Sequence, residues 1–223
     1  MKKNYLQNAK RFVRNSLSFF SFILLFFTTM QTYAQNPQCQ WTEKIVGAGF
    51  DYAVSTSTDN NGNVYVAGDF DSPTLTFNNG ITLANSGVDD AYLAKYNSDG
   101  VCQWAEKIAG KGFDHARSIS TDANGNVYVV GYFQSDTLIF NNGITLSNSG
   151  SYDPFIARYN NDGICQWAEK IAGTGRDEAS SISTDANGNV YVVGYFQSYT
   201  LIFNNGISLA NSGDLDGYIA KYN

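Results

Sequence analysis

The residues of this chain that could carry acid–base or nucleophilic chemistry are few. His115 is the only histidine among the 223 residues. A histidine can act as a general base, but none of the familiar nucleophile spacings accompanies it. The chain is internally repeated, and the positions equivalent to His115 hold Tyr52 and Glu178. We therefore interpret His115 as a solvated loop residue and predict no catalytic residue.

Three aspartates recur at one position of the repeat, directly after glycine-rich turns: Asp51, Asp114 and Asp177. A single catalytic acid would not need three copies, so we expect these carboxylates to form structural hydrogen bonds. Asp89 and Asp90 could imitate the paired carboxylates of a hydrolase. However, adjacent residues of a strand face opposite ways, which argues against a shared site.

Metal and disulfide chemistry are also disfavoured. The three cysteines, Cys39, Cys102 and Cys165, occupy one repeat position each, and we expect reduced, buried thiols. The DANGN segments at 122–126 and 185–189 begin like a calcium loop, but no bidentate glutamate follows them. We interpret them as Asx-type hairpin turns and expect no metal site and no cofactor.

The repeat that places these residues has a period of 63, and the segments CQWTEKI, CQWAEKI and CQWAEKI begin at Cys39, Cys102 and Cys165. The three repeats span 39–101, 102–164 and 165–223. Short β-rich runs alternate with Asn-Gly or Asp-Gly turns that favour antiparallel hairpins. In the second repeat we expect strands over 116–121, 126–133, 137–140, 144–148, 154–159 and 164–171.

These runs predict four main strands with an extra hairpin inserted between the second and the third. The segment VYVVGYF at 127–133 is apolar on both faces, so it needs cover on both sides. Sheets stacked face to face supply that cover, with the tryptophans between them. We predict an all-β, propeller-like array of three four-stranded antiparallel blades, each with an inserted hairpin. A β-trefoil-like fold is the alternative, because three four-strand repeats also describe it.

The segments DNNGNVYVAGDF and DANGNVYVVGYF, with the CQWAEKI strands, resemble the SBBP (β-propeller) repeat family of exported bacterial proteins. The resemblance covers residues 39–223, and it implies a surface or secreted protein without implying any chemistry. Propellers usually have four to eight blades, so three blades leave several possibilities open. These are an open arc, half of a six-blade dimer joined through the open blade ends, or a fragment of a longer surface protein. The first strand could also complete the last blade.

Residues 1–34 resemble a cleavable signal peptide, with five basic residues before an apolar run over 17–27. That run is short for a membrane span, although an uncleaved anchor is the alternative. Without the leader, nine basic residues face 20 acidic ones, a formal charge of −11. We expect export to the cell surface, the medium or the periplasm. Neither nucleic acid nor, after cleavage, the membrane is an expected partner.

We therefore predict a non-enzymatic binding, adhesion or scaffold surface at or outside the cell envelope, whose partner is an unidentified surface polymer or protein. A propeller-fold enzyme acting on extracellular glycans is the alternative. In a meander of antiparallel strands, alternate connections lie at the same end of the sheet. The loops that differ between repeats therefore lie together at one end of the sheets, and such loops are where recognition usually resides. The individual ligand-binding candidates there are Tyr52, His115, Arg176 and Tyr199.

Overall fold

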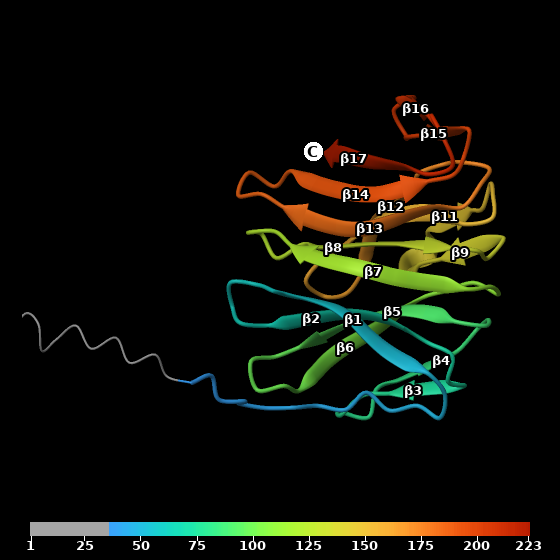
Figure 1. The fold of residues 1–223 in the computed structure, drawn as a ribbon. Helices are drawn as coiled ribbons and strands as arrows, with labels where there is room; N and C mark the ends of the chain where they lie inside the picture. Colours follow the sequence, from blue (N-terminus) through green and yellow to red (C-terminus); the bar gives the residue numbers. More distant parts are fainter. Residues whose placement is uncertain (1–35) are drawn as a thin grey trace, which may run out of the picture. The chain divides into compact units, whose positions relative to one another are not determined.

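The computed structural model describes residues 36–223, and within them the chain forms 17 β-strands and one 3₁₀ turn (Figure 1). The predicted leader, residues 1–34, lies outside the described residues. No helix in the described part is both long and apolar enough to cross a membrane. The main strands form three antiparallel sheets, which we call blades 1 to 3.

Blade 1 has the order β1 (Asp51–Thr58), β2 (Val64–Phe70), β5 (Asp90–Tyr96), β6 (Cys102–Ile108). Blade 2 has the order β7 (Asp114–Thr121), β8 (Val127–Phe133), β11 (Asp153–Tyr159), β12 (Cys165–Lys170). Blade 3 has the order β13 (Asp177–Thr184), β14 (Val190–Phe196), β17 (Asp216–Tyr222).

Each blade carries an inserted two-stranded hairpin between its second and third main strands, as the sequence predicts. The hairpins are β3 (Thr74–Thr76) with β4 (Thr82–Ala84), β9 (Thr137–Ile139) with β10 (Thr145–Ser147), and β15 (Thr200–Ile202) with β16 (Ser208–Ala210). The 3₁₀ turn η1 (Asn141–Gly143) connects β9 to β10. After each fourth strand the chain bridges to the hairpin of the following blade, for example Ala109 to Ile139.

The DANGN segments are the predicted hairpin turns. Asp122 Oδ1 accepts hydrogen bonds from the backbone N–H groups of Asn124 and Asn126, both at 2.9 Å. Gly125 has a φ of 79°, a backbone conformation that is strained for residues with a side chain. Because the carboxylate accepts these backbone hydrogen bonds, it serves as the Asx cap of the turn, as predicted.

The first strand of each blade contains a β-bulge, which the sequence pattern does not predict. The register of β7 on β8 shifts between Ala116 and Ser118. There the carbonyl oxygen of His115 comes so close to Gly131 that a Cβ on this glycine would lie 1.9 Å from it. The equivalent glycines, Gly68 and Gly194, face the same contact, which accounts for a glycine in every second strand.

The blades stack face to face, and the core lies between them. All seven residues of β8 are buried, which confirms the expected cover on both faces. One cluster joins Leu93 of blade 1 to Val129 of blade 2, and a second joins Val130 of blade 2 to Val192 of blade 3. These stacked, separate sheets are the predicted propeller-like arrangement and not the trefoil alternative. The prediction of four main strands holds for blades 1 and 2 and is wrong for blade 3, which has three.

The tryptophans fill the margins of these interfaces. The Trp104 ring lies 6.0 Å from that of Tyr65, and its indole N–H donates to the Asn161 carbonyl of the following blade at 3.1 Å. The predicted burial of the cysteines holds for Cys102 and Cys165 and is wrong for Cys39, which is exposed.

Candidate functional site

The first strands of the three blades, β1, β7 and β13, lie side by side and set the geometry of the candidate site (Figure 1). Serine side chains join them: Ser55 Oγ accepts from Ile119 N, and Ser118 Oγ accepts from Ile182 N, both at 3.2 Å. The second residue of each strand therefore recurs at the same end of the stack. Those residues are Tyr52, His115 and Glu178, and each is paired with a residue of the second strand: Asp69, Tyr132 and Tyr195.

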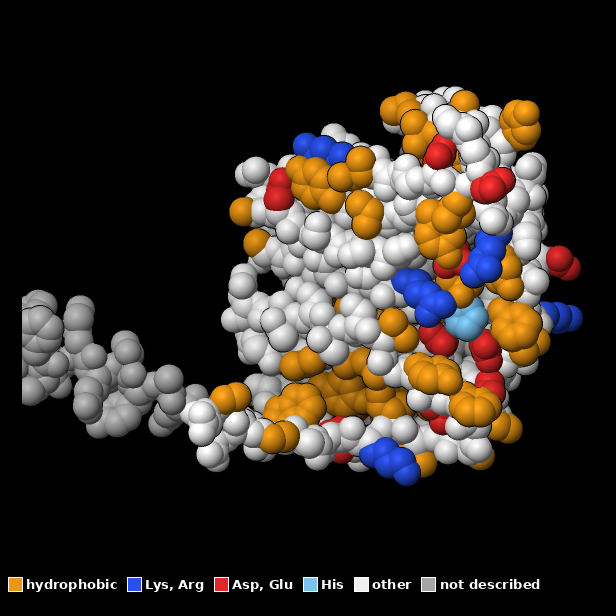
Figure 2. Space-filling view, in the orientation of Figure 1, with side chains coloured by type: hydrophobic (Ala, Val, Ile, Leu, Met, Phe, Trp, Pro, Cys, Tyr) orange, Lys and Arg blue, Asp and Glu red, His pale blue; other side chains and the backbone are white. Residues whose placement is uncertain are grey.

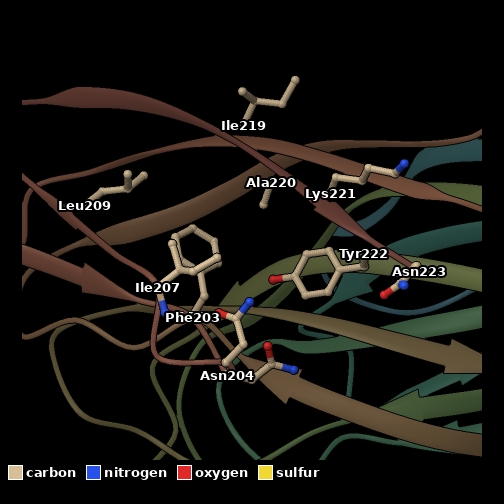
Figure 3. A pocket seen from close by; sticks show the side chains of 10 residues that line it. Phe203, Asn204, Ile207, Leu209, Ile219, Ala220, Lys221, Tyr222 and Asn223 are labelled. Carbon is tan, nitrogen blue, oxygen red and sulfur yellow. Dashed lines mark hydrogen bonds between the residues drawn. The ribbon is translucent and has the colours of Figure 1, made fainter.

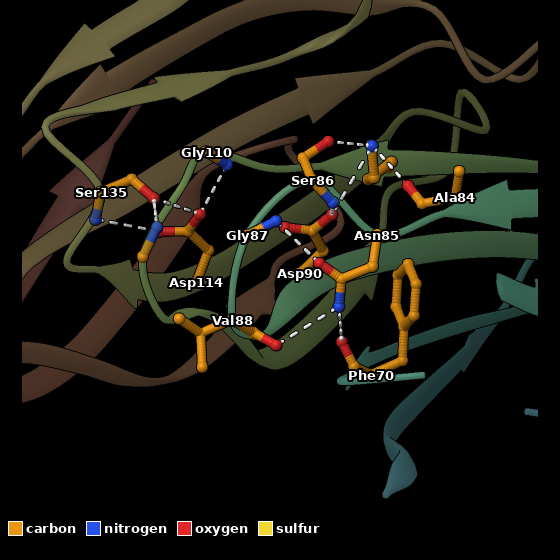
Figure 4. A network of polar contacts seen from close by, with 12 residues as sticks. Phe70, Ala84, Asn85, Ser86, Gly87, Val88, Asp90, Gly110, Asp114 and Ser135 are labelled. Atoms are coloured by element: carbon orange, nitrogen blue, oxygen red, sulfur yellow. Dashed lines mark hydrogen bonds and ion pairs between the residues drawn. The ribbon is translucent and has the colours of Figure 1, made fainter. Parts of the chain in front are cut away.

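Buried aspartates fix the loops at this end. Asp114 Oδ2 accepts hydrogen bonds from Gly110 N and Ser135 Oγ, both at 2.6 Å (Figure 4). Asp177 accepts from Ser198 in the same manner. The predicted structural role is thus confirmed for two of the three aspartates. For Asp51 the role stays a prediction, and its Oδ1 atom is buried without a hydrogen-bond partner in the described part of the chain.

A second set of aspartates opens the third strand of each blade. Asp90 Oδ2 accepts from Ser86 N at 2.6 Å and lies 3.6 Å from Lys107 Nζ (Figure 4). Burial raises the pKa of Asp90 to about 6, although the Ser86 N–H and the Lys107 ammonium oppose the rise. Asp89 points elsewhere, toward His115. The two adjacent carboxylates therefore do not share a site, as predicted.

These anchored loops also hold neighbouring blades together. The Asp89 carbonyl accepts from Asp114 N at 2.9 Å, and the Tyr152 carbonyl accepts from Asp177 N at 3.0 Å. Each contact forms a parallel bridge between the third-strand loop of one blade and the first strand of the next. Side chains at this end consequently stand on a backbone that is hydrogen-bonded across blades.

His115 lies in the middle of this end, between the first two blades. Its Nδ1 atom is 3.2 Å from Asp69 Oδ2 and its Nε2 atom is 3.8 Å from Asp89 Oδ2. Its ring stacks on Phe113 at 6.3 Å and tilts against Tyr132 at 5.1 Å. Only 15% of the side chain is exposed, so the interpretation as a solvated loop residue is wrong.

Arg176 and Glu178 continue the surface onto blade 3. Arg176 Nε donates to Glu178 Oε1 at 2.7 Å, and its guanidinium lies 5.4 Å from the Tyr152 ring. Tyr152 meets Tyr132 edge-on at 5.3 Å. The Arg117 guanidinium lies over the Tyr132 ring, 4.9 Å from its centroid, and donates to the Tyr132 hydroxyl at 2.6 Å. A continuous set of aromatic and charged side chains thus spans the three blades.

We call this surface the variable rim. It consists of Tyr52, Asp69, Asp89, Phe113, His115, Arg117, Tyr132, Tyr152, Arg176 and Glu178. Figure 2 shows the single histidine side chain on this face, bordered by acidic, basic and hydrophobic side chains.

The electrostatics of the variable rim follow from partial burial. Burial raises the pKa of Asp89, His115 opposes that rise, and the Asp69 and Asp71 carboxylates add to it. Burial likewise raises the pKa of Tyr132 against the opposing charge of Arg117. The rim therefore combines closely spaced charges of both signs with aromatic faces. Within residues 36–223, no group of three or more metal-ligating side chains is arranged to hold an ion.

Three of the four predicted ligand-binding residues lie on the rim. His115 and Arg176 are joined through Tyr132 and Tyr152, and Tyr52 pairs with Asp69, the neighbour of His115. Tyr199 differs, because it precedes β15 in the inserted hairpin, where it is 89% exposed. Sequence reasoning missed Asp69, Asp89, Tyr132, Tyr152 and Arg117. Their variation between repeats was the signal that could have identified them.

Comparison with known proteins supports the repeat assignment. The sequence model of the SBBP family, described as a beta-propeller repeat, matches residues 166–195. A second model, a beta-propeller domain of unknown function (DUF5122), matches residues 143–163. Because the repeats share their motifs at a period of 63, the positions that these models match have counterparts in the other repeats.

Two curated proteins are similar to the chain. One is an uncharacterized WD repeat-containing protein of Acanthamoeba polyphaga mimivirus, 30% identical over 76% of this chain and 13% of its own length. The other is the regulatory protein FlaEY of Caulobacter vibrioides, 28% identical over 61% of this chain and 14% of its own. The chain thus spans about a seventh of each relative's length.

Among solved structures, a protein of unknown function from Bacteroides caccae aligns with a TM-score of 0.31 and 13% identity, over 78% of this chain and 61% of that one. That similarity is too low to bear on the fold. The stacked antiparallel sheets and the two β-propeller matches agree with each other. The chain is a β-propeller repeat protein whose third repeat matches the SBBP repeat over residues 166–195.

Proposed function

We propose that this chain is a non-enzymatic recognition module whose variable rim binds a surface polymer or a protein, and that it acts at the cell envelope or outside it. The leader-like residues 1–34 support export. The acidic balance of the remaining residues disfavours nucleic acid as the ligand.

One observation carries the proposal: the residues that differ between repeats gather at one end of the stacked sheets. At the rim, equivalent positions hold Tyr52, His115 and Glu178. At the opposite end, the turns that begin at Asp59, Asp122 and Asp185 keep nearly the same sequence and the same Asx hydrogen bonds. A turn that only builds the fold can keep the same sequence in every blade. A surface that binds one asymmetric ligand contacts it differently in each blade, and so needs different residues there.

The composition of the rim is also that of a binding interface. Tyrosine and arginine are the side chains that most often dominate binding energy, because they bring a large contact area with polar tips. Several rim side chains remain accessible, among them Tyr52 and Phe113. The hydrogen bonds between blades keep these contacts in place before binding, which lowers the entropic cost of association.

The enzyme alternative centres on His115, which lies between two carboxylates and could move a proton. None of the hydrogen bonds and ion pairs found for His115 in the described part involves a hydroxyl or thiol nucleophile. Its neighbours are rings and carboxylates that pack it between blades. A positioning role in the rim therefore accounts for its contacts better than catalysis does.

The test compares two triple variants on immobilised bacterial surface polysaccharides, peptidoglycan and a peptide panel. The rim variant carries Tyr52→Ala, Phe113→Ala and Arg176→Ala. The matched control carries Asn61→Ala, Asn124→Ala and Asn187→Ala in the turns at the other end, where these residues are also exposed.

We expect a surface polymer or peptide bound by the unmodified protein to bind the rim variant at least about tenfold more weakly, a loss of about 1.4 kcal/mol. The control should bind unchanged. Loss of binding in the control alone would place recognition at the opposite end. Release of soluble products that disappears with His115→Ala would identify the chain as an enzyme instead.

A further inference from the structure

A cleft with a volume of about 670 Å³ lies between blade 1 and the inserted hairpin of blade 2. One wall is formed by β4, β6 and the loop that follows β6, and the other by residues 136–141, which include β9. The volume is in the range of small-molecule sites. The residues that line the cleft are different from those of the variable rim, so it is a separate surface.

Buried aspartates hold both walls of the cleft in place (Figure 4). Asp90 Oδ2 lies 3.6 Å from Lys107 Nζ, so the charge of this lysine is already balanced within blade 1. Asp114 accepts hydrogen bonds from Gly110 N and Ser135 Oγ, which ties the loop after β6 to the residues before β9. There a Cβ on Gly110 would lie 2.2 Å from the Ser135 side chain. Because these hydrogen bonds form the cleft before a ligand binds, they lower the entropic cost of association.

Three charged side chains line the cleft without an ion partner in the described part of the chain: Glu106, Lys111 and Asp136. Glu106 is half-buried, and burial raises its pKa, although a hydrogen bond from the Asn141 side chain opposes the rise. A partly buried carboxylate is stabilised by a nearby cation. Lys111 and Asp136 directly follow the two residues that Asp114 ties together, so these exposed residues stand at one mouth of the cleft.

The frame of the cleft recurs in the other repeats. Phe140 and Asn141, which line the cleft, correspond to Phe203 and Asn204 on the inserted hairpin of blade 3 (Figure 3). The carboxylate at position 106 is likewise repeated, as Glu43 and Glu169. The frame is thus shared, and the differences between repeats lie at the mouth.

Two positions at the mouth change from repeat to repeat. Lys111 corresponds to Ala48 and Thr174, and Asp136 corresponds to Pro73 and Tyr199. A lysine and an aspartate therefore occur together at these positions only in the cleft between blades 1 and 2. Tyr199, the predicted ligand-binding residue that lies away from the rim, occupies the position of Asp136 in its own repeat. Variation at neighbouring positions of a repeated frame indicates recognition of a specific ligand.

Between the mouth and Glu106 the lining of the cleft is largely apolar. Leu83, Ala109 and Ile139 line this part, and Ile139 is 51% exposed. Two backbone hydrogen bonds, of 3.1 and 2.9 Å, join Ala109 to Ile139 and so connect the two walls. Glu106 lies three residues before Ala109, roughly 10 Å along an extended chain. A ligand that reaches from the mouth to Glu106 must therefore be long, with methylene groups in its middle.

We propose that the cleft between blades 1 and 2 binds a free basic α-amino acid, such as lysine or arginine. Lys111 binds the α-carboxylate, Asp136 binds the α-ammonium group, and Glu106 binds the cation at the end of the ligand's side chain. The methylene groups of that side chain lie over Ala109 and Ile139. Each of the three unpaired charges of the cleft thus meets a group of opposite sign through a charge-assisted hydrogen bond. The site does not depend on the function proposed for the variable rim.

The test pairs changes in the ligand with changes in the protein. L-lysine, L-norleucine, which lacks the side-chain ammonium, and L-lysine amide, which lacks the carboxylate, are each titrated into the purified protein by calorimetry. L-lysine should bind at least about tenfold more tightly than either analogue. Glu106→Gln should lower the affinity for L-lysine to that for L-norleucine and leave the affinity for L-norleucine unchanged. Lys111→Met should have the same relation to L-lysine amide.

The repeat supplies a matched control. Glu169→Gln changes the equivalent carboxylate of the next repeat and should leave the binding of L-lysine unchanged. An equal loss of affinity in Glu169→Gln and Glu106→Gln would overturn the assignment of the site. Equal affinity of the unmodified protein for L-lysine and L-norleucine, or no binding of L-lysine or L-arginine up to about 10 mM, would overturn the ligand class. The comparison of ligands on the unmodified protein needs no variant, so it decides the question even where a variant does not fold.

Discussion

The Nδ1 atom of His115 in blade 2 lies 3.2 Å from the Oδ2 atom of Asp69 in blade 1. Asp69 is almost fully buried, and its other carboxylate oxygen has no hydrogen-bond partner in the described part of the chain. The His115 Nδ1 atom is also buried without a hydrogen-bond partner in the described part, so the contact is a close approach of an imidazole to a carboxylate. A buried carboxylate with few partners is costly, and His115 is a basic group beside it. The contact joins two blades through side chains that no other blade repeats.

Replacing His115 should therefore destabilise the protein through Asp69. We expect His115→Ala to lower the free energy of unfolding by about 1–3 kcal/mol, because a buried polar group loses its neighbour. Asp69→Asn in the same chain should recover part of the loss, and urea unfolding of the single and double variants measures the coupling. Tyr52→Ala, an exposed change at the same end, is the control. Additive losses would show that the two residues do not interact.

Asp90 should make stability depend on pH. Burial raises its folded-state pKa to about 6, above the ordinary value of 3.8. The folded protein therefore holds this proton more tightly than the unfolded chain does. Stability should fall as the pH rises from about 4 to about 6, by about 1–3 kcal/mol for this group.

Two variants separate Asp90 from the other carboxyl groups in that experiment. Asp90→Asn should flatten the dependence between about pH 4 and pH 6, since the amide oxygen can still accept from Ser86 N. The Lys107 ammonium opposes the rise in the pKa of Asp90, so Lys107→Met should raise that pKa further. The fall in stability should then extend to higher pH. A pH profile of Asp90→Asn parallel to that of the unmodified protein would refute the assignment.

The fold was predictable because its signals are local. The Asn-Gly and Asp-Gly turns and the doubly apolar segment at 127–133 identify hairpins and a covered strand without knowledge of any distant contact. The variable rim was only partly predictable. We expected the first strand of the second repeat at 116–121, but β7 is Asp114–Thr121, so His115 belongs to a strand and not to a loop.

The rest of the rim depends on contacts between repeats. Asp69 and Asp89 reach His115 only because blades 1 and 2 stack in one register. Tyr199 differs from the other three candidates in its position. It varies between repeats like the rim residues, but its place in the inserted hairpin leaves it 89% exposed. Sequence variation identifies candidates, whereas strand pairing decides which of them meet.

Two of the three thiols should resist modification in the folded protein. Burial raises the pKa of Cys102 to about 11 and that of Cys165 to about 12, so at pH 8 only about one thiol in a thousand or fewer is the reactive thiolate. Brief treatment with iodoacetamide followed by peptide mapping should find Cys102 and Cys165 unmodified. The same treatment in urea should modify both. Rapid labelling of either residue without urea would show that the sheets open locally.

Gly131 should be the least replaceable residue of β8, because the bulge in β7 directs the His115 carbonyl at it. A Cβ at this position would lie 1.9 Å from that oxygen, so Gly131→Ala must displace backbone in the middle of blade 2. We expect a loss of at least about 2 kcal/mol in the free energy of unfolding. Gly213→Ala is the matched control, since a Cβ there meets nothing within 4 Å and its φ is not positive. Thermal and urea unfolding of both variants provide the measurement. Equal stability of the two would mean that the bulge is not held as the structure has it, and the position of His115 beside Asp69 and Asp89 would then be wrong as well.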